Sequence, residues 1–93
     1  SNAERFLPGA PMEPLPQLVA RCRERGVKLT PQRLAIFEFL AGYRGHATAE
    51  EVYRDVRASH PNLSFATVYN TLELLAELGE VRKVIVDELR RRY

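Results

Sequence analysis

The sequence contains one cysteine, one methionine and no tryptophan among 93 residues, and it has no long apolar segment. A single cysteine cannot form an internal disulfide, which is typical of proteins from a reducing compartment. No run approaches the roughly 20 apolar residues that a membrane-spanning helix needs. Phe6-Leu7 is followed at once by Pro8-Gly9 rather than by the apolar core of a signal peptide. These absences predict a cytoplasmic protein.

Charge is present in both signs and nearly balanced, with a formal net charge of +2. This balance permits nucleic-acid binding without requiring it, so the positions of the cations matter more than their number. Each basic group, taken alone, is equally consistent with a solvated helix face. The groups are Arg21, Arg23, Arg25 and Lys28; Arg54 and Arg57; and Arg82, Lys83, Arg90, Arg91 and Arg92.

The chain has the length of one small domain with a single core. Ser1-Asn2-Ala3 is typical of the remnant that tag removal leaves. Four of the six prolines lie between residues 8 and 16, which predicts a flexible or extended leader. We therefore assign residues 1–14 to a tag remnant and flexible leader, and residues 15–93 to the domain.

Three helices are predicted by their start and stop signals. Apolar spacing and the cap position of Gly26 place the first helix at about 16–25. Thr30 is a capping residue followed by proline, so the second helix begins at Pro31. Thr48 and Glu51 have the spacing of a capping box at the start of a third helix, which ends before Pro61.

A fourth helix is predicted between Ser64, as its capping residue, and Gly79. Helical spacing separates its residues into two faces. The predicted core face comprises Phe65, Val68, Leu72, Leu75 and Ala76. It is expected to pack against an apolar stripe of the second helix that includes Phe37. The opposite face comprises Ala66, Thr67, Asn70 and Glu73, with Tyr69 on the shoulder between the two. Small, uncharged residues near a helix N-terminus suit a helix that enters a DNA groove.

After Gly79 the pattern changes to that of a strand. Residues 81–86 are rich in β-branched side chains, Asp87-Glu88 can form a turn, and Leu89–Tyr93 can return antiparallel. Several helices followed by a short hairpin predict a mainly α fold with a small β-hairpin, the winged helix-turn-helix.

Three segments resemble the ferric-uptake-regulator (Fur) family in order and spacing. They are GVKLTPQR at 26–33, HATAEEVY at 46–53 and SFATVYNTL at 64–72, and the LGEV at 78–81 fits as well. The resemblance covers about residues 15–93 and implies the N-terminal, DNA-binding half of such a protein. Members are metal- or peroxide-sensing repressors that bind operators as dimers.

The resemblance also implies a C-terminal α/β domain for dimerisation and metal sensing, which this chain lacks. No Cys-x-x-Cys pair is present, so the structural zinc site common in the family is absent from these residues. We expect a fragment that is monomeric by itself and holds no cofactor, although a naturally short protein is the alternative. For the full-length protein the resemblance implies a divalent metal, Fe, Mn or Zn. The sensed signal, the operator sequence and the target genes are left open.

The base-reading pair is predicted to be Tyr69 and Asn70. A tyrosine ring packs on a thymine methyl group, and asparagine pairs bidentately with adenine. Iron-sensing relatives often carry arginine where this chain has Asn70, so in this respect the chain is closer to peroxide-sensing members. Further DNA contacts are predicted for residues that flank this pair in the fold, namely Lys28, Arg33, Ser64, Ala66, Thr67, Arg82 and Lys83. For Lys28 the resemblance implies a minor-groove contact.

The resemblance implies that His46 is one ligand of a regulatory metal, with the other ligands in the missing domain. Taken alone, a loop histidine is usually just exposed. Cys22 is predicted to be a core residue, and no nucleophile lies near either histidine in a pattern typical of catalysis, so we do not expect an enzyme. The alternative function is a winged-helix protein-interaction module. Such a module should expose large apolar side chains on the outer face of the fourth helix, where Leu74 is the one candidate.

Overall fold

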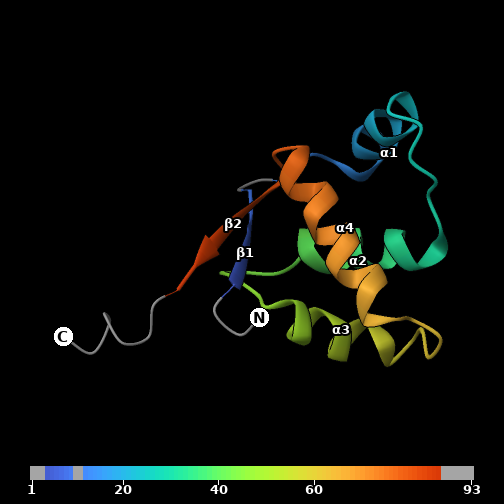
Figure 1. Cartoon of the computed structure of the whole chain (residues 1–93). Coiled ribbons are helices and arrows are strands. Elements are labelled where there is room, and N and C mark those ends of the chain that lie inside the picture. The colour runs from blue at the N-terminus through green and yellow to red at the C-terminus, as the bar shows by residue number, and fades with distance from the viewer. Residues whose placement is uncertain (1–3, 10–11, 87–93) are drawn as a thin grey trace.

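A computed structural model of the chain describes residues 4–9 and 12–86 (Figure 1). Within these described residues, four helices and two strands follow one another. In chain order they are β1 (Glu4–Pro8), α1 (Leu15–Glu24), α2 (Pro31–Ala41), α3 (Ala49–Arg57), α4 (Phe65–Glu77) and β2 (Val81–Ile85). The three-helix core with its small sheet is the predicted winged helix-turn-helix. Within the described segments, no helix has the length and apolarity to cross a membrane.

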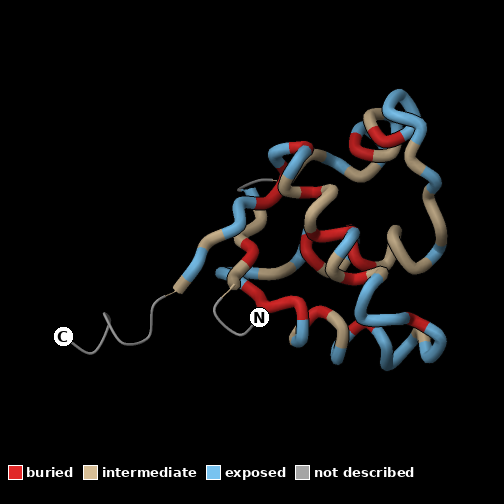
Figure 2. Tube along the Cα trace, viewed as in Figure 1, coloured by how far each residue is buried: buried red, intermediate tan, exposed pale blue. Residues whose placement is uncertain are grey.

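The hydrophobic core lies where α2, α3 and α4 pack against one another and against the sheet, and α1 adds Leu18 and Cys22 to it (Figure 2). Phe37 of α2 and Leu72 of α4 are both buried, as their facing stripes predicted. Cys22 is also fully buried, which confirms its prediction as a core residue, and burial raises the pKa of its thiol. The other fully buried large side chains are Phe6, Leu18, Ile36, Leu40, Val52, Val68, Thr71 and Leu75.

Side-chain caps set the starts of α2, α3 and α4. The hydroxyl oxygens of Thr30 and Ser64 accept hydrogen bonds from the backbone N–H groups of Arg33 and Thr67, at 3.2 and 3.1 Å. Each cap satisfies one of the N–H groups that the first turn of a helix leaves without a partner. These two predicted caps are therefore confirmed, and the Ser64 cap lies at the start of α4, which carries the predicted site.

The capping box at the start of α3 is formed in both directions. The Thr48 hydroxyl accepts from the Glu51 N–H at 3.0 Å, and a Glu51 carboxylate oxygen accepts from the Thr48 N–H at 3.2 Å. Tyr43 donates to the same carboxylate at 3.3 Å. Burial acts to raise the pKa of Glu51, but the hydrogen bonds from Thr48 and Tyr43 outweigh it and hold this pKa below its ordinary value of 4.5.

This capping box predicts a loss of stability in acid. A carboxyl whose pKa is lower in the folded than in the unfolded chain stabilises the fold above the unfolded pKa, and this contribution disappears as the pH falls through the folded pKa. The unfolding free energy should therefore fall as the pH is lowered through and below 4.5, the ordinary pKa of a glutamate. Urea unfolding of Glu51→Gln, followed by circular dichroism, should show a shallower pH dependence in this window. Equal slopes for the two proteins would show that Glu51 does not contribute.

The N-terminal segment forms part of the fold, contrary to the prediction of a flexible leader up to residue 14. Residues 4–8 form β1, which pairs antiparallel with β2, with Phe6 opposite Lys83. On its other side, Phe6 exchanges two backbone hydrogen bonds with Ala47, at 2.8 and 3.0 Å. Burial of the Phe6 ring holds the strand in place. The predicted return strand at 89–93 lies outside the described residues.

A charged cluster fixes the turn between α4 and β2. Gly79 has a φ of +78°, a conformation that glycine adopts without strain, and it redirects the chain out of α4. Arg21 of α1 donates to the carboxylates of Glu13 and Glu80, at 2.7 and 2.9 Å, and to the carbonyl of Leu78 at 2.8 Å. The same guanidinium thus ties α1 to the start of β2.

The face of α4 that packs on the core differs from the prediction at its start. Phe65 was assigned to the core, but it is 38% exposed, because it is the first residue of the helix and lies at the edge of the packed face. Its ring packs edge-on against Tyr53 of α3. Thr71, which was not assigned to the core face, is fully buried. Its hydroxyl donates to the Thr67 carbonyl one turn earlier, at 2.7 Å, so a polar residue is accommodated in the core.

Candidate nucleic-acid interface

The outer face of the first turns of α4 is small, polar and open. Ala66 and Asn70 are exposed, and the side chain of Asn70 makes no hydrogen bond within the described part of the chain. The hydroxyl oxygens of Ser64 and Thr67 lie 2.9 Å apart, and one donates to the other. One hydroxyl proton of the pair therefore stays available for an outside acceptor, such as a phosphate oxygen.

The structure brings the predicted cations before and within α2 next to this face. Lys28 and Arg33 line a shallow depression of about 240 Å³ together with Thr30, Gln32 and Thr67. Arg33 donates to the Lys28 carbonyl at 2.9 Å, which fixes the two residues relative to each other. Lys28 and Arg33 are separated in sequence from α4 but lie against its first turn, so one surface presents both positive charge and hydroxyl groups.

Tyr69 lies on the side of α4 that faces the sheet. Its ring is half-buried and packs edge-on against Phe6, with centroids 6.3 Å apart. Its hydroxyl donates to the Glu4 carboxylate, at 3.2 and 3.4 Å from the two oxygens. Burial, and then the Glu4 and Glu73 carboxylates, raise the pKa of Tyr69.

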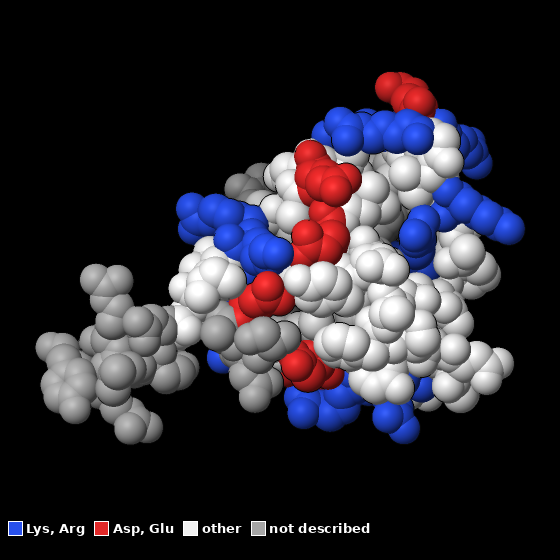
Figure 3. All heavy atoms as spheres, in the orientation of Figure 1, with Lys and Arg blue, Asp and Glu red and all other residues white. Residues whose placement is uncertain are grey.

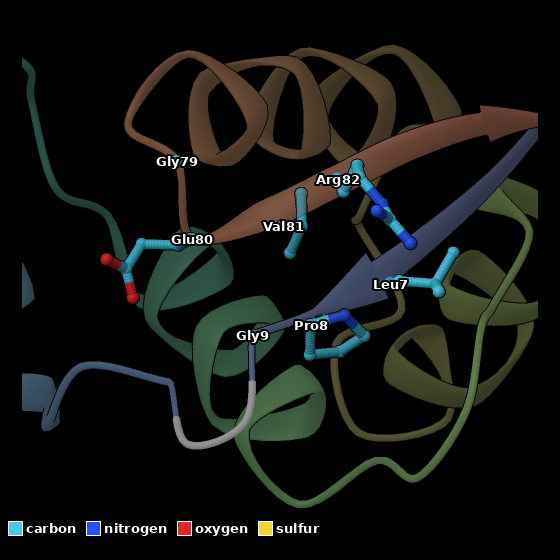
Figure 4. A pocket seen from close by; sticks show the side chains of 7 residues that line it. All are labelled: Leu7, Pro8, Gly9, Gly79, Glu80, Val81 and Arg82. Carbon is cyan, nitrogen blue, oxygen red and sulfur yellow. The ribbon is translucent and has the colours of Figure 1, made fainter.

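The two cations of β2 point in different directions, although both were predicted to contact the DNA backbone. Successive residues of a strand face opposite sides of the sheet. Lys83 faces α4, where its ammonium lies 2.8 Å from Glu73 and 3.7 Å from Glu4, and 6.0 Å above the Tyr69 ring. Arg82 lies on the opposite side, in a hollow beside its register partner Leu7 (Figure 4). Lys83 is thus already paired, and Arg82 is exposed.

Charge divides α4 into two halves. The face seen in Figure 3 carries acidic side chains in a strip along the middle, with basic groups on both sides. The acids of α4 itself are Glu73 and Glu77, both in its C-terminal half. The N-terminal half carries no charged side chain and lies beside Lys28 and Arg33. A polyanion is therefore favoured at the N-terminal half and repelled by the C-terminal half.

No metal site is complete within residues 4–9 and 12–86, where no three His, Cys, Asp or Glu side chains are grouped suitably. His46 is exposed, immediately before the bridge that Ala47 makes with β1. One imidazole does not satisfy the four or more ligands that first-row metals take. The described residues by themselves do not fit a metal ion, and the ligand role of His46 stays a prediction.

Exposed apolar side chains do not cover the outer face of α4. The large exposed hydrophobic residues among those described are Phe65, the first residue of α4, and Ile85, the last residue of β2. Leu74, predicted to be exposed, is half-buried. This arrangement disfavours a hydrophobic protein-binding face along the outer row of α4.

Glu4 is the residue near this surface that sequence reasoning missed. Glu4 was placed in the leader. It lies 65 residues before Tyr69 in the sequence, and no local pattern indicates that β1 brings the two side chains together. Phe6 was the one available signal, since phenylalanine is among the residue types most often buried.

The fold and this face define a winged helix-turn-helix domain whose fourth helix presents an open, uncharged N-terminal half beside two cations. Comparison with known proteins agrees. The profile described as the Ferric uptake regulator family matches residues 24–93. The chain belongs to the ferric uptake regulator family.

Relatives with known names are regulators. The chain is 37% identical over 79 residues to the peroxide operon regulator of Bacillus subtilis, and 35% identical over 79 residues to the peroxide-responsive repressor PerR of Staphylococcus epidermidis. Each match covers 85% of this chain and 54% and 53% of those relatives. The chain thus spans about half the length of the curated relatives it matches.

Solved structures of PerR share the fold. PerR from Streptococcus pyogenes superposes with a TM-score of 0.72 at 32% identity, over 77% of this chain and 49% of that one. The structure of GAS PerR-Zn-Zn superposes with a TM-score of 0.73 at 32% identity, over 77% of this chain and 46% of that one.

Proposed function

We propose that this chain is the operator-binding part of a transcriptional repressor that controls peroxide-stress genes. The observation that carries the proposal is that Thr67, in the capped first turn of α4, lies beside Lys28 and Arg33, with the exposed Asn70 one turn further along the same helix. Asn70 is exposed and has a free amide to pair with a base edge. Lys28 and Arg33 lie beside the first turn of α4. The DNA backbone passes at this position when a helix occupies the major groove.

The remaining predicted contacts fit around this centre. Ser64 and Thr67 offer a hydroxyl to a phosphate at the N-terminus of α4, where the helix dipole also favours an anion. Ala66 leaves room for the groove wall, and Tyr69 offers a ring edge beside Asn70. Arg82 and Lys83 would reach the flanking backbone, Lys83 after leaving its present carboxylate partners.

Peroxide is the proposed signal because the named relatives respond to it and because asparagine occupies position 70. Sensing, dimerisation and metal binding would belong to the whole protein. We propose that His46 contributes one ligand there, completed by residues outside this chain. Such proteins act as dimers on two half-sites, so a single domain should bind DNA weakly.

Replacement of Asn70 tests the base-reading role. Preferred sites are first selected from a random-sequence duplex pool with the unmodified chain, and binding is then measured by fluorescence anisotropy. Asn70→Ala should weaken binding to the selected site by about 5- to 150-fold, equivalent to about 1–3 kcal/mol, because the bidentate pair with adenine is lost. Binding to a random duplex should change little.

Glu38→Gln is a suitable control, since Glu38 is exposed on α2 and was assigned no DNA contact. An equal loss on selected and random DNA would contradict base reading by Asn70. Absence of any salt-dependent DNA binding by the unmodified chain would contradict the proposed function itself.

A further inference from the structure

The N-terminal strand brings a carboxylate onto the surface proposed to meet DNA. Glu4 lies at the end of β1, opposite Ile85 in the sheet register, on the side of the sheet that faces α4. Two residues proposed for DNA contact, Tyr69 and Lys83, are its partners there, at 3.2 Å and 3.7 Å.

We propose that Glu4 is an autoinhibitory element that occupies Tyr69 and Lys83 in the DNA-free protein and that DNA must displace. This inference rests on the proposed function. The single proton of the Tyr69 hydroxyl is donated to Glu4, so a hydroxyl contact from Tyr69 to DNA, made in addition to its proposed ring contact, requires this bond to break. A phosphate that approaches Lys83 is also repelled by the Glu4 carboxylate, which lies 3.7 Å from the Lys83 ammonium.

The strand holds this carboxylate in place through contacts that do not involve DNA. Phe6, two residues further along β1, is fully buried and packs against the Tyr69 ring. Its backbone is paired with Lys83 on one side and Ala47 on the other. Glu4 is therefore presented by a docked strand rather than by a freely moving terminus.

Glu73 shares Lys83 with Glu4 but differs in origin. Glu73 belongs to α4 itself, and its carboxylate lies 2.8 Å from the Lys83 ammonium. Its position on α4 does not depend on the docking of β1. Glu4 arrives with β1, and its contribution depends on that strand. We therefore assign the inhibition to Glu4, whose carboxylate comes from outside α4 and contacts both Tyr69 and Lys83.

The test compares Glu4→Gln with Glu24→Gln in the whole chain. Both changes raise the net charge by one, but Glu24 is exposed at the end of α1, away from the sheet. The probe is a short mixed-sequence duplex, titrated by fluorescence anisotropy at several salt concentrations between about 50 and 200 mM. Glu4→Gln should bind about two- to fivefold more tightly than the unmodified chain, a gain of the size that exposed charge pairs give, and the gain should shrink as salt screens it. Glu24→Gln should change binding much less.

The contact itself is checked by titrating the tyrosine ring carbons in NMR spectra, with Tyr69→Phe to assign the Tyr69 signal. Glu4→Gln should lower the pKa of Tyr69, because the carboxylate is one cause that raises it. Unchanged affinity, equal gains in both variants, or an unchanged Tyr69 pKa would overturn the autoinhibitory role while leaving DNA binding intact. Failure of all three proteins to bind DNA would instead overturn the proposed function.

Discussion

Phe6→Ala is expected to destabilise the domain by about 3–5 kcal/mol, the usual cost of truncating a fully buried phenylalanine. The ring fills the core between the sheet and α4, and its loss leaves a cavity and weakens the docking of β1. Domains of this size are stable by only about 5–15 kcal/mol, so a substantial part of the margin would be lost. Urea unfolding followed by circular dichroism measures the change.

Ile85→Ala is the matched control for the Phe6 substitution. Ile85 lies on β2 but is 64% exposed, so its truncation should cost well under 1 kcal/mol. If Phe6→Ala is as mild as Ile85→Ala, β1 does not contribute to the folded state in solution, and Glu4 is not held beside Tyr69.

Leu72→Ala should cost about 2–5 kcal/mol, because Leu72 is fully buried on the core face of α4. The loss should lower the thermal midpoint by well over 5 °C, given that 1 kcal/mol shifts a domain of this size by about 4–8 °C. A melting curve of the substituted chain, followed by circular dichroism, gives this shift.

Leu74 provides the control on the same helix. It is only half-buried, so Leu74→Ala should be clearly milder than Leu72→Ala. Equal effects of the two substitutions would mean that the core face of α4 is misassigned.

Local rules determined most of the fold from the sequence alone. Thr30-Pro31, the Thr48/Glu51 box and Ser64 set the starts of three helices, because capping involves residues only three positions apart. The period of apolar residues identified the core side of α4 correctly except at its first turn, where Phe65 lies at the end of the packed interface. The exposure of Asn70 followed from the same period.

Only the tertiary structure decided which distant segments meet. Backbone pairing is open to any strand, so nothing in the local pattern shows that residues 4–8 would pair with β2. Lys83 was predicted to contact DNA, and the sequence did not show that Glu4 and Glu73 approach it from two other elements. The same applies to Lys28, Arg33 and Thr67, which share one depression. Sequence periodicity reports which side of an element is apolar, whereas these charge and hydrogen-bond partners depend on how separate elements pack, and that is set by the core as a whole.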